Sequence, residues 1–293
     1  GIAAGCGMAD DRARCGEIQF VDYHQSAAQT IRLAARIYYQ SYGDWNCPML
    51  LRMKAGSGGG GPISDSGSGG GAFGHSNAGE QWFTNVPGLI TICPATPYDA
   101  KGLLIQASLS QSPVVFLERG RLYRAEAPSA RKDGAPIPAL EALWNVPDGY
   151  YTEPIGQART LRIGAGAPVA TIVSWGMMLL ESAIAAARFA QASGGAVEVV
   201  DLRTLMPFDE DAILRSVRQT NRAIVVTEEP DLTSFGRHLH SWIAQQLFWQ
   251  LDSAPVFISA IAAPSAPYDA PEETAFYPTA ETIQHALEQL ARE

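Results

Sequence analysis

The sequence predicts an α/β protein built from two doubly wound domains. Strand-like and helix-like segments alternate along most of its 293 residues, and the strands are short, continuous apolar runs. Such strands, separated by helices, are typical of a mostly parallel sheet that is covered on both faces. The alternation stops from about 126 to 155, where the chain is rich in proline and lacks periodicity. We therefore expect domains at 1–130 and 156–293, with a linker at 131–155.

The first domain begins with strand and helix patterns that have clear boundaries. The first long helix is expected over 24–43, because apolar residues such as Ile31 and Ala35 recur close to the helical period. Pro97 favours the start of a later helix, since proline suits the first helical turn. The expected strands are 17–23, 48–55, 89–95 and 113–118, and the expected helices are 24–43, 79–88 and 97–111.

The second domain repeats the alternation after the linker. Its first helix is expected to end at Gly194 and Gly195, which separate it from the following apolar strand. The expected strands are 169–175, 196–202, 223–229 and 256–261, and the expected helices are 177–193, 209–220, 235–251 and a last one that starts at Thr279.

Composition excludes several classes of protein. Hydrophobic residues make up 46% and charged residues 17%, as in a globular chain. The net charge of −9, without a cluster of Lys and Arg, argues against nucleic-acid binding. The four cysteines have no C-x-x-C spacing, which argues against a metal site and favours reduced thiols in the cytoplasm. The longest apolar run, 169–180, is too short for a bilayer span of about 20 residues, so no membrane segment is expected.

A glycine-rich stretch follows the expected strand at 48–55. It reads "KAGSGGGGPISDSGSGGGAFGHSNAGE", where nine of the sixteen residues from Gly56 to Gly71 are glycine and His75 lies just beyond them. A phosphate cradle is disfavoured, because the run contains Pro62 and the chain has neither G-x-G-x-x-G after a first strand nor a P-loop motif. We expect the glycines to provide mobility and His75 to provide chemistry.

The other four histidines are weaker candidates for a site. His238 and His240 are two residues apart on an expected helix, so they point to different faces and do not suit one metal ion. His285 lies on the last helix and is interpreted as structural, and His24 is interpreted as a surface residue.

Several stretches together resemble one known family. They are "GEIQFVDY", "NCPMLLRM", "GHSNAGEQWFTNVPGL", "ATPYDAKGLL", "PVVFLERGRLYR", "VDLRTLMPFDEDAI" and the "YP" at 277–278. Over nearly the whole chain they resemble the beta subunit of the thiamine-diphosphate-dependent 2-oxoacid dehydrogenases, a family that includes the pyruvate, branched-chain and acetoin dehydrogenases. The resemblance implies an N-terminal domain that binds the pyrimidine of thiamine diphosphate and a C-terminal transketolase-type domain.

The resemblance also implies a reaction, oxidative decarboxylation of a 2-oxoacid followed by acyl transfer to a lipoyl group. In this family the cofactor acts as the electron sink, and a glutamate activates its aminopyrimidine. That glutamate precedes the segment that matches "GIAAG", so we expect it to lie before Gly1 and the chain to be truncated at its N-terminus. Glu17 matches a different acidic position of the family.

Three residues match site positions of the family. Gln19 and Tyr23 match positions that pack against the aminopyrimidine, where an aromatic ring stacks on the heterocycle and an amide bonds its edge. His75, in "HSN" where the family has "HSQ", matches the active-site histidine, which can supply a proton or a positive charge. The alternatives are a half-buried aromatic at a strand end for Tyr23 and a solvated loop histidine for His75. The "IQF" and "DY" pattern is closer to the branched-chain type.

The implied partners complete the expectation. An alpha subunit would hold the diphosphate through Mg²⁺ in a complex of two alpha and two beta chains, and a lipoyl acyltransferase component would accept the acyl group. A structural K⁺ ion is implied near the main-chain carbonyls from Ala107 to Ser112. Two alternatives remain: a non-catalytic or assembly subunit that keeps the fold, and the C-terminal half of a transketolase or deoxyxylulose-phosphate synthase.

Overall fold

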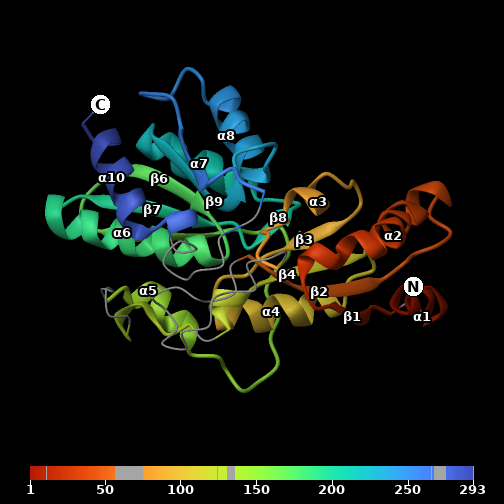
Figure 1. Cartoon of the computed structure of the whole chain (residues 1–293). Helices are drawn as coiled ribbons and strands as arrows, with labels where there is room; N and C mark the ends of the chain where they lie inside the picture. Colours follow the sequence, from red (N-terminus) through yellow and green to blue (C-terminus); the bar gives the residue numbers. More distant parts are fainter. Residues whose placement is uncertain are drawn as a thin grey trace.

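The computed structural model describes residues 1–10, 12–56, 75–123, 125–130, 136–264, 266 and 275–292. Two α/β units lie side by side, one formed by the red to yellow part of the chain and the other by its green to blue part (Figure 1). Each unit contains a mostly parallel sheet with helices on both faces, which confirms the expected fold class. The expected glycine-rich loop, 56–71, lies outside the described residues except for Gly56.

The first sheet has the strand order β1-β2-β4-β3-β8, and only β8 is antiparallel to its neighbour. Its strands are β1 (Arg14–Ile18), β2 (Met49–Ala55), β3 (Ile90–Ile92), β4 (Val114–Arg119) and β8 (Thr204–Met206). The accompanying helices are α1 (Ile2–Asp10), α2 (Ala28–Gln40), α3 (Gln81–Thr84) and α4 (Pro97–Ser108), with 3₁₀ turns η1 (Val21–Ala27) and η2 (Gly120–Leu122).

The two faces of this sheet bury different residues of the same strand. Phe116 of β4 packs with Leu103 of α4, whereas Leu117 belongs to the larger cluster that contains Ile31 of α2. This alternation follows from the two-residue period of a strand, and it explains why β4 is apolar on successive positions.

The second sheet has the strand order β10-β9-β6-β7-β5, with β5 antiparallel at one edge. Its strands are β5 (Arg159–Gly164), β6 (Pro168–Ser174), β7 (Ala196–Asp201), β9 (Ala223–Pro230) and β10 (Val256–Ala260). Its helices are α6 (Met177–Ser193), α7 (Glu210–Thr220), α8 (Phe235–Gln246) and α10 (Ala280–Leu290). Helices α6 and α10 cover one face, and α7 and α8 cover the other (Figure 1).

The connection between the units forms short helical turns and then runs against α4. These turns are η3 (Pro128–Ala130), α5 (Pro138–Glu141) and η4 (Ala142–Trp144). Beyond them, Tyr151 and Glu153 lie on α4 at Gly102, where a Cβ atom would come within 2.9 Å of Tyr151 and 2.7 Å of Glu153. The glycine in "PYDAKG" is therefore required for this close approach.

Buried ion pairs join the two units beside α4. Asp99, at the start of α4, is fully buried and accepts hydrogen bonds of 2.8 Å from both Arg159 and Arg203. Arg203 also pairs with Glu153 of the connection at 2.6 Å. Asp201 lies next to this group, and burial, followed by the charge of Asp99, raises its pKa to about 8. Asp99 of "PYDAKG" and Arg203 of "DLRT" therefore meet at the junction between the units.

The structure corrects three expectations from the sequence. The strand expected at 17–23 ends at Ile18, after which the chain turns into η1. The edge strand β5 was not predicted, because its buried residues, Leu161 and Ile163, alternate with exposed ones and form no continuous apolar run. The three-residue strand β8 was not predicted either, because its partner β3 belongs to the other unit and the pairing is not local in sequence.

Candidate active site

His75 lies in an aromatic cluster at the end of β1. Its ring stacks on Phe20, with centroids 4.3 Å apart and 12° between the planes, and meets Tyr23 edge-on at 5.3 Å. The His75 Nε2 atom lies 3.3 Å from the Tyr23 hydroxyl oxygen. The structure therefore brings together two of the three residues that the sequence singled out.

The early end of β1 produces this arrangement. Because the strand stops at Ile18, Gln19 and Phe20 form a bend, and Tyr23 projects from η1 at the carboxyl end of the parallel strands. Ligands of open α/β sheets bind at this end. Gln19 is exposed in this bend, and its side chain forms no hydrogen bond with another described residue. It is close to the cluster in sequence but makes no contact with His75 or Tyr23 that the structure records.

The segment that follows His75 is held at successive residues. The buried hydroxyl of Tyr277, from the second unit, donates to the Ser76 carbonyl at 2.9 Å. The Gly56 amide donates to the Asn77 carbonyl at 2.7 Å, and the Asn77 side chain donates to Asp22. His75 is therefore half-buried and attached to a backbone that both units fix.

A buried arginine also connects the residues that follow His75 to the second unit. Arg119, at the end of β4, donates to Glu80 and pairs with Glu228 of β9 at 2.9 Å. The Trp175 indole donates to the same Glu80 carboxylate at 2.8 Å. These side chains are almost fully buried, and Gly176, at φ +54°, leaves room for Arg119, since a Cβ atom there would lie 2.9 Å from its Nε atom. Removing one charged partner would leave the other charges buried and unpaired.

A second carboxylate links the two units in the same place. Glu229 of β9 accepts hydrogen bonds from the Gln81 amide at 2.7 Å and the Phe235 amide at 2.8 Å. Burial raises the pKa of Glu229 to about 7, although the two amides and Arg119 oppose this effect. Glu229 thus links α3, which follows the segment that carries His75, to the start of α8.

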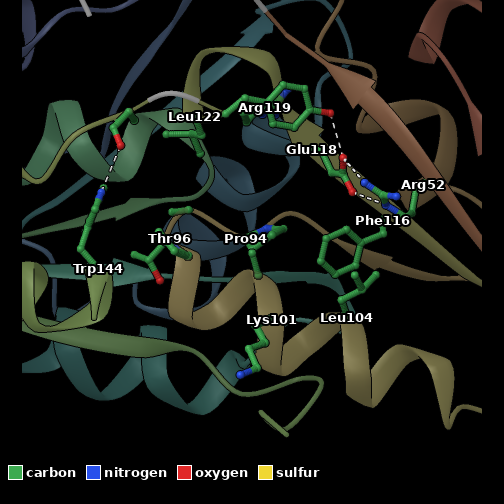
Figure 2. A pocket seen from close by; sticks show the side chains of 15 residues that line it. Arg52, Pro94, Thr96, Lys101, Leu104, Phe116, Glu118, Arg119, Leu122 and Trp144 are labelled. Atoms are coloured by element: carbon green, nitrogen blue, oxygen red, sulfur yellow. Dashed lines mark hydrogen bonds and ion pairs between the residues drawn. The ribbon is translucent and has the colours of Figure 1, made fainter. Parts of the chain in front are cut away.

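A cavity of about 380 Å³ lies between α4 and the ends of β2 and β4 (Figure 2). Its charged lining is paired internally: Arg52 forms two hydrogen bonds with Glu118, at 2.6 and 3.0 Å, and Tyr123 donates to Glu118 at 2.8 Å. Burial and the bond to Glu118 raise the pKa of Tyr123. None of the three residues predicted from the sequence lines this cavity. The cavity therefore does not define the candidate site.

Three of the four remaining histidines have structural contacts, and His285 is exposed on α10. His24 is buried and stacks on Trp82 at 4.3 Å, which corrects the expectation of a surface residue, and burial lowers its pKa. His240 Nε2 lies 2.8 Å from the Pro255 carbonyl oxygen, and His238 packs against aromatic rings of its own unit. Within the ranges that the structure describes, no group of three or more His, Cys, Asp or Glu side chains is arranged for a metal ion.

Comparison with known proteins assigns the chain to a family. The profile "Transketolase, pyrimidine binding domain" matches residues 1–126, and "Transketolase, C-terminal domain" matches 157–283. The 2-oxoisovalerate dehydrogenase subunit beta of Pseudomonas aeruginosa is 35% identical over 89% of this chain and 69% of its own length. The subunit of the same name from Bacillus subtilis is 32% identical over 99% of this chain and 80% of its own length. This chain belongs to the beta subunits of the 2-oxoacid dehydrogenases.

Two further similarities agree with the beta-subunit family and its fold. The beta subunit of the acetoin:2,6-dichlorophenolindophenol oxidoreductase of Cupriavidus necator is 33% identical over 97% of this chain and 74% of its own length. A solved split-gene transketolase, described as an inactive beta4 tetramer, superposes with a TM-score of 0.68 at 18% identity over 99% of this chain and 80% of that one. The latter similarity shows the transketolase-like fold.

Sequence reasoning did not find several residues that shape the site of this beta subunit. Phe20, on which the imidazole stacks, stands inside "EIQFVDY" but was treated as part of a strand. Lys54 and Tyr277 bond the main chain at His75 and Ser76 from positions distant in sequence. The sequence held two weak signals of these residues. Lys54 begins the glycine-rich stretch, and Tyr277 stands in the matched "YP".

No helix in the described part of the beta subunit is both long and apolar enough to cross a membrane.

Proposed function

We propose that this chain is the beta subunit of the decarboxylase component of a 2-oxoacid dehydrogenase. The observation that carries the proposal is the cluster of Phe20, Tyr23 and His75 at the carboxyl end of the first sheet. The relatives named as beta subunits of 2-oxoisovalerate and pyruvate dehydrogenases support the same reaction class. Within it, the 2-oxoisovalerate relatives and the "IQF" pattern favour a branched-chain 2-oxoacid as substrate.

The cluster fits the aminopyrimidine of thiamine diphosphate. Tyr23 is 49% exposed although it is aromatic, so part of its ring remains available to stack on a flat heterocycle. Gln19 is exposed in the bend that precedes η1, and its amide can both donate to and accept from the edge of such a ring. Gln19 and Tyr23 would therefore hold the pyrimidine. Bound thiamine diphosphate would supply the nucleophile and the electron sink of the reaction.

His75 is the candidate catalytic residue of this chain. Its Nε2 atom lies 3.3 Å from the Tyr23 hydroxyl oxygen, so this atom can exchange a proton with an oxygen at that distance. The stacking on Phe20 fixes the plane of the imidazole, so less reorientation of the ring is needed before a proton is transferred. Its role would be to hold or donate a proton at Nε2 as the 2-oxoacid reacts.

The proposal includes the rest of the assembly. An alpha subunit would complete the site and hold the diphosphate through Mg²⁺, in a complex of two alpha and two beta chains. A lipoyl acyltransferase component would accept the acyl group, and main-chain carbonyls around 107–112, after α4, would bind a structural K⁺ ion. A cytoplasmic location is supported by four cysteines without a disulfide partner. We also propose that 1–130 and 156–293 are the two domains, with 131–155 as their linker.

The test is decarboxylation by this protein produced together with its alpha subunit. Release of CO₂ would be measured with thiamine diphosphate and Mg²⁺ and a panel of pyruvate and branched-chain 2-oxoacids. We expect turnover that needs both subunits and the cofactor, and that is fastest with a branched-chain substrate. Absence of turnover together with absence of cofactor binding would contradict the proposal and favour a non-catalytic subunit that keeps the fold.

A further inference from the structure

Lys54 connects the main chain of His75 to the first sheet. It lies near the end of β2, is half-buried, and donates a 2.7 Å hydrogen bond to the His75 carbonyl oxygen. The same ammonium donates to the Gly56 carbonyl oxygen at 3.1 Å. One charged group therefore bonds the backbone at both described residues that flank 57–74.

The same ammonium also contacts the ring on which His75 stacks. Lys54 Nζ lies 5.2 Å from the centroid of Phe20, within the range of a cation–π interaction. Phe20 in turn stacks on the imidazole at 4.3 Å. Lys54 thus fixes His75 twice, through its carbonyl and through the aromatic ring beneath its side chain.

We propose that Lys54 is a positioning residue for His75. Its ammonium sets the direction in which the imidazole Nε2 atom points, toward the Tyr23 hydroxyl. The inference rests on the proposed function, because it assigns Lys54 a part in the reaction through His75. Lys54 itself acts on the backbone and on Phe20, and no contact with substrate is required.

The surrounding contacts make this effect separable from folding. Ser76 is held by Tyr277, and Asn77 is held through its side chain by Asp22, so neither of these bonds involves Lys54. Removing the ammonium would therefore loosen His75 while the following segment keeps its anchors. At least the two charge-assisted hydrogen bonds to Gly56 and His75 would be lost. A displacement of about 1 Å at a catalytic group can reduce a rate about a hundredfold.

The chain offers a matched control for Lys54. Lys101 of α4 is also half-buried, donates to a main-chain carbonyl, that of Pro147, and lies 5.1 Å from the ring centroid of Tyr151. It makes the same two kinds of contact, but its partners Pro147 and Tyr151 belong to the connection between the units and not to the cluster around His75. Lys54→Met and Lys101→Met therefore remove the same kinds of interaction at two different sites.

The kinetic test uses the alpha–beta complex with thiamine diphosphate, Mg²⁺ and the 2-oxoacid that the wild type turns over best. Lys54→Met is expected to lower kcat about tenfold to a hundredfold, with KM and cofactor affinity changed less than about threefold. Lys101→Met is expected to stay close to the wild type, and Lys54→Arg is expected to restore most of kcat. Wild-type kcat in Lys54→Met would overturn the inference.

A double-mutant cycle with His75 separates positioning from a general structural effect. If Lys54 acts through His75, adding Lys54→Met to His75→Ala should cause no further loss of kcat. The same fractional loss in both backgrounds would contradict the inference, because it would mean that Lys54 acts independently of His75.

A spectroscopic test does not depend on turnover. In protein labelled with ¹³C-histidine, the Cε1–H resonance of His75, assigned by its absence in His75→Ala, should carry a ring-current shift from Phe20. Lys54→Met should reduce that shift, and Lys101→Met should leave it unchanged. An unchanged His75 resonance in Lys54→Met would overturn the inference, even if the complex has no activity. Absence of activity in the wild-type complex would contradict only the proposed function.

Discussion

Asp201 provides a sharp prediction about stability and pH. This residue ends β7, is fully buried, and accepts one hydrogen bond of 3.2 Å, from the Arg203 amide to its Oδ1 atom. Burial, followed by the charge of Asp99, raises its pKa from 3.8 to about 8, while Arg203 acts in the opposite direction. Asp201 is therefore expected to be mostly protonated at pH 7 in the folded protein.

The size of the effect follows from the shift. Each pKa unit corresponds to about 1.4 kcal/mol, so a rise from 3.8 to about 8 corresponds to about 6 kcal/mol. Between these values the folded state holds a proton that the unfolded state has released. The free energy of unfolding should therefore decrease as pH rises, by up to about 1.4 kcal/mol per pH unit from this group.

The substitution Asp201→Asn removes the titration while it keeps the shape and the Oδ1 acceptor. Urea unfolding at pH 5, 6, 7 and 8, followed by far-UV circular dichroism, measures the free energy of unfolding of wild type and variant. We expect a flatter pH dependence in Asp201→Asn and, at pH 8, a stability at least equal to that of the wild type. Asp148→Asn, at an exposed position, serves as the control and should keep the wild-type slope.

Two outcomes would refute this reasoning. Equal slopes in wild type and Asp201→Asn would show that Asp201 does not hold a proton in the folded state. A loss of about 3 kcal/mol or more at pH 8 would show that Asp201 is an ionised partner of Arg203, because breaking a buried ion pair costs about that much.

Two further predictions concern the anchors of the His75 segment. Arg119→Met should lower the free energy of unfolding by about 3–5 kcal/mol, because Glu80 and Glu228 would lose the buried cation that pairs with them. Urea unfolding measures this free energy, and a loss below about 1 kcal/mol would contradict the prediction. Tyr277→Phe should lower the free energy of unfolding by about 1 kcal/mol, since it removes the hydrogen bond to the Ser76 carbonyl. The substitution should also lower kcat of the alpha–beta complex. Unchanged stability and kcat would show that this bond does not support His75.

The fold was predictable where hydrophobic patterns are local. Helix α6 was predicted with its observed bounds, because Gly194 and Gly195 mark its end and its apolar residues repeat over many turns. Strand β8 was not predictable, since three residues pair with β3 across the junction between the units. Strand β5 was missed because only one of its faces is buried, so it lacks the continuous apolar run of the central strands.

The candidate site was predictable in part. His75 and Tyr23 came from the match to a family, and the structure places them in contact. Their supports could not be found in this way, because Lys54 and Tyr277 act on main-chain carbonyls, and such bonds leave little trace in a sequence. Side chains that bond each other impose matching residue types, whereas a carbonyl acceptor is present at every position.

The most direct test of the account is the effect of His75→Ala on turnover by the alpha–beta complex. The bonds to the main-chain carbonyls of His75 and Ser76 do not involve the imidazole, so the variant should fold, assemble and bind thiamine diphosphate as the wild type does. We predict that kcat with the preferred 2-oxoacid falls at least about a hundredfold, the size expected for loss of a general acid or base. A variant that binds the cofactor and retains kcat within about twofold of the wild type would contradict the assignment of His75 as the catalytic residue of this chain.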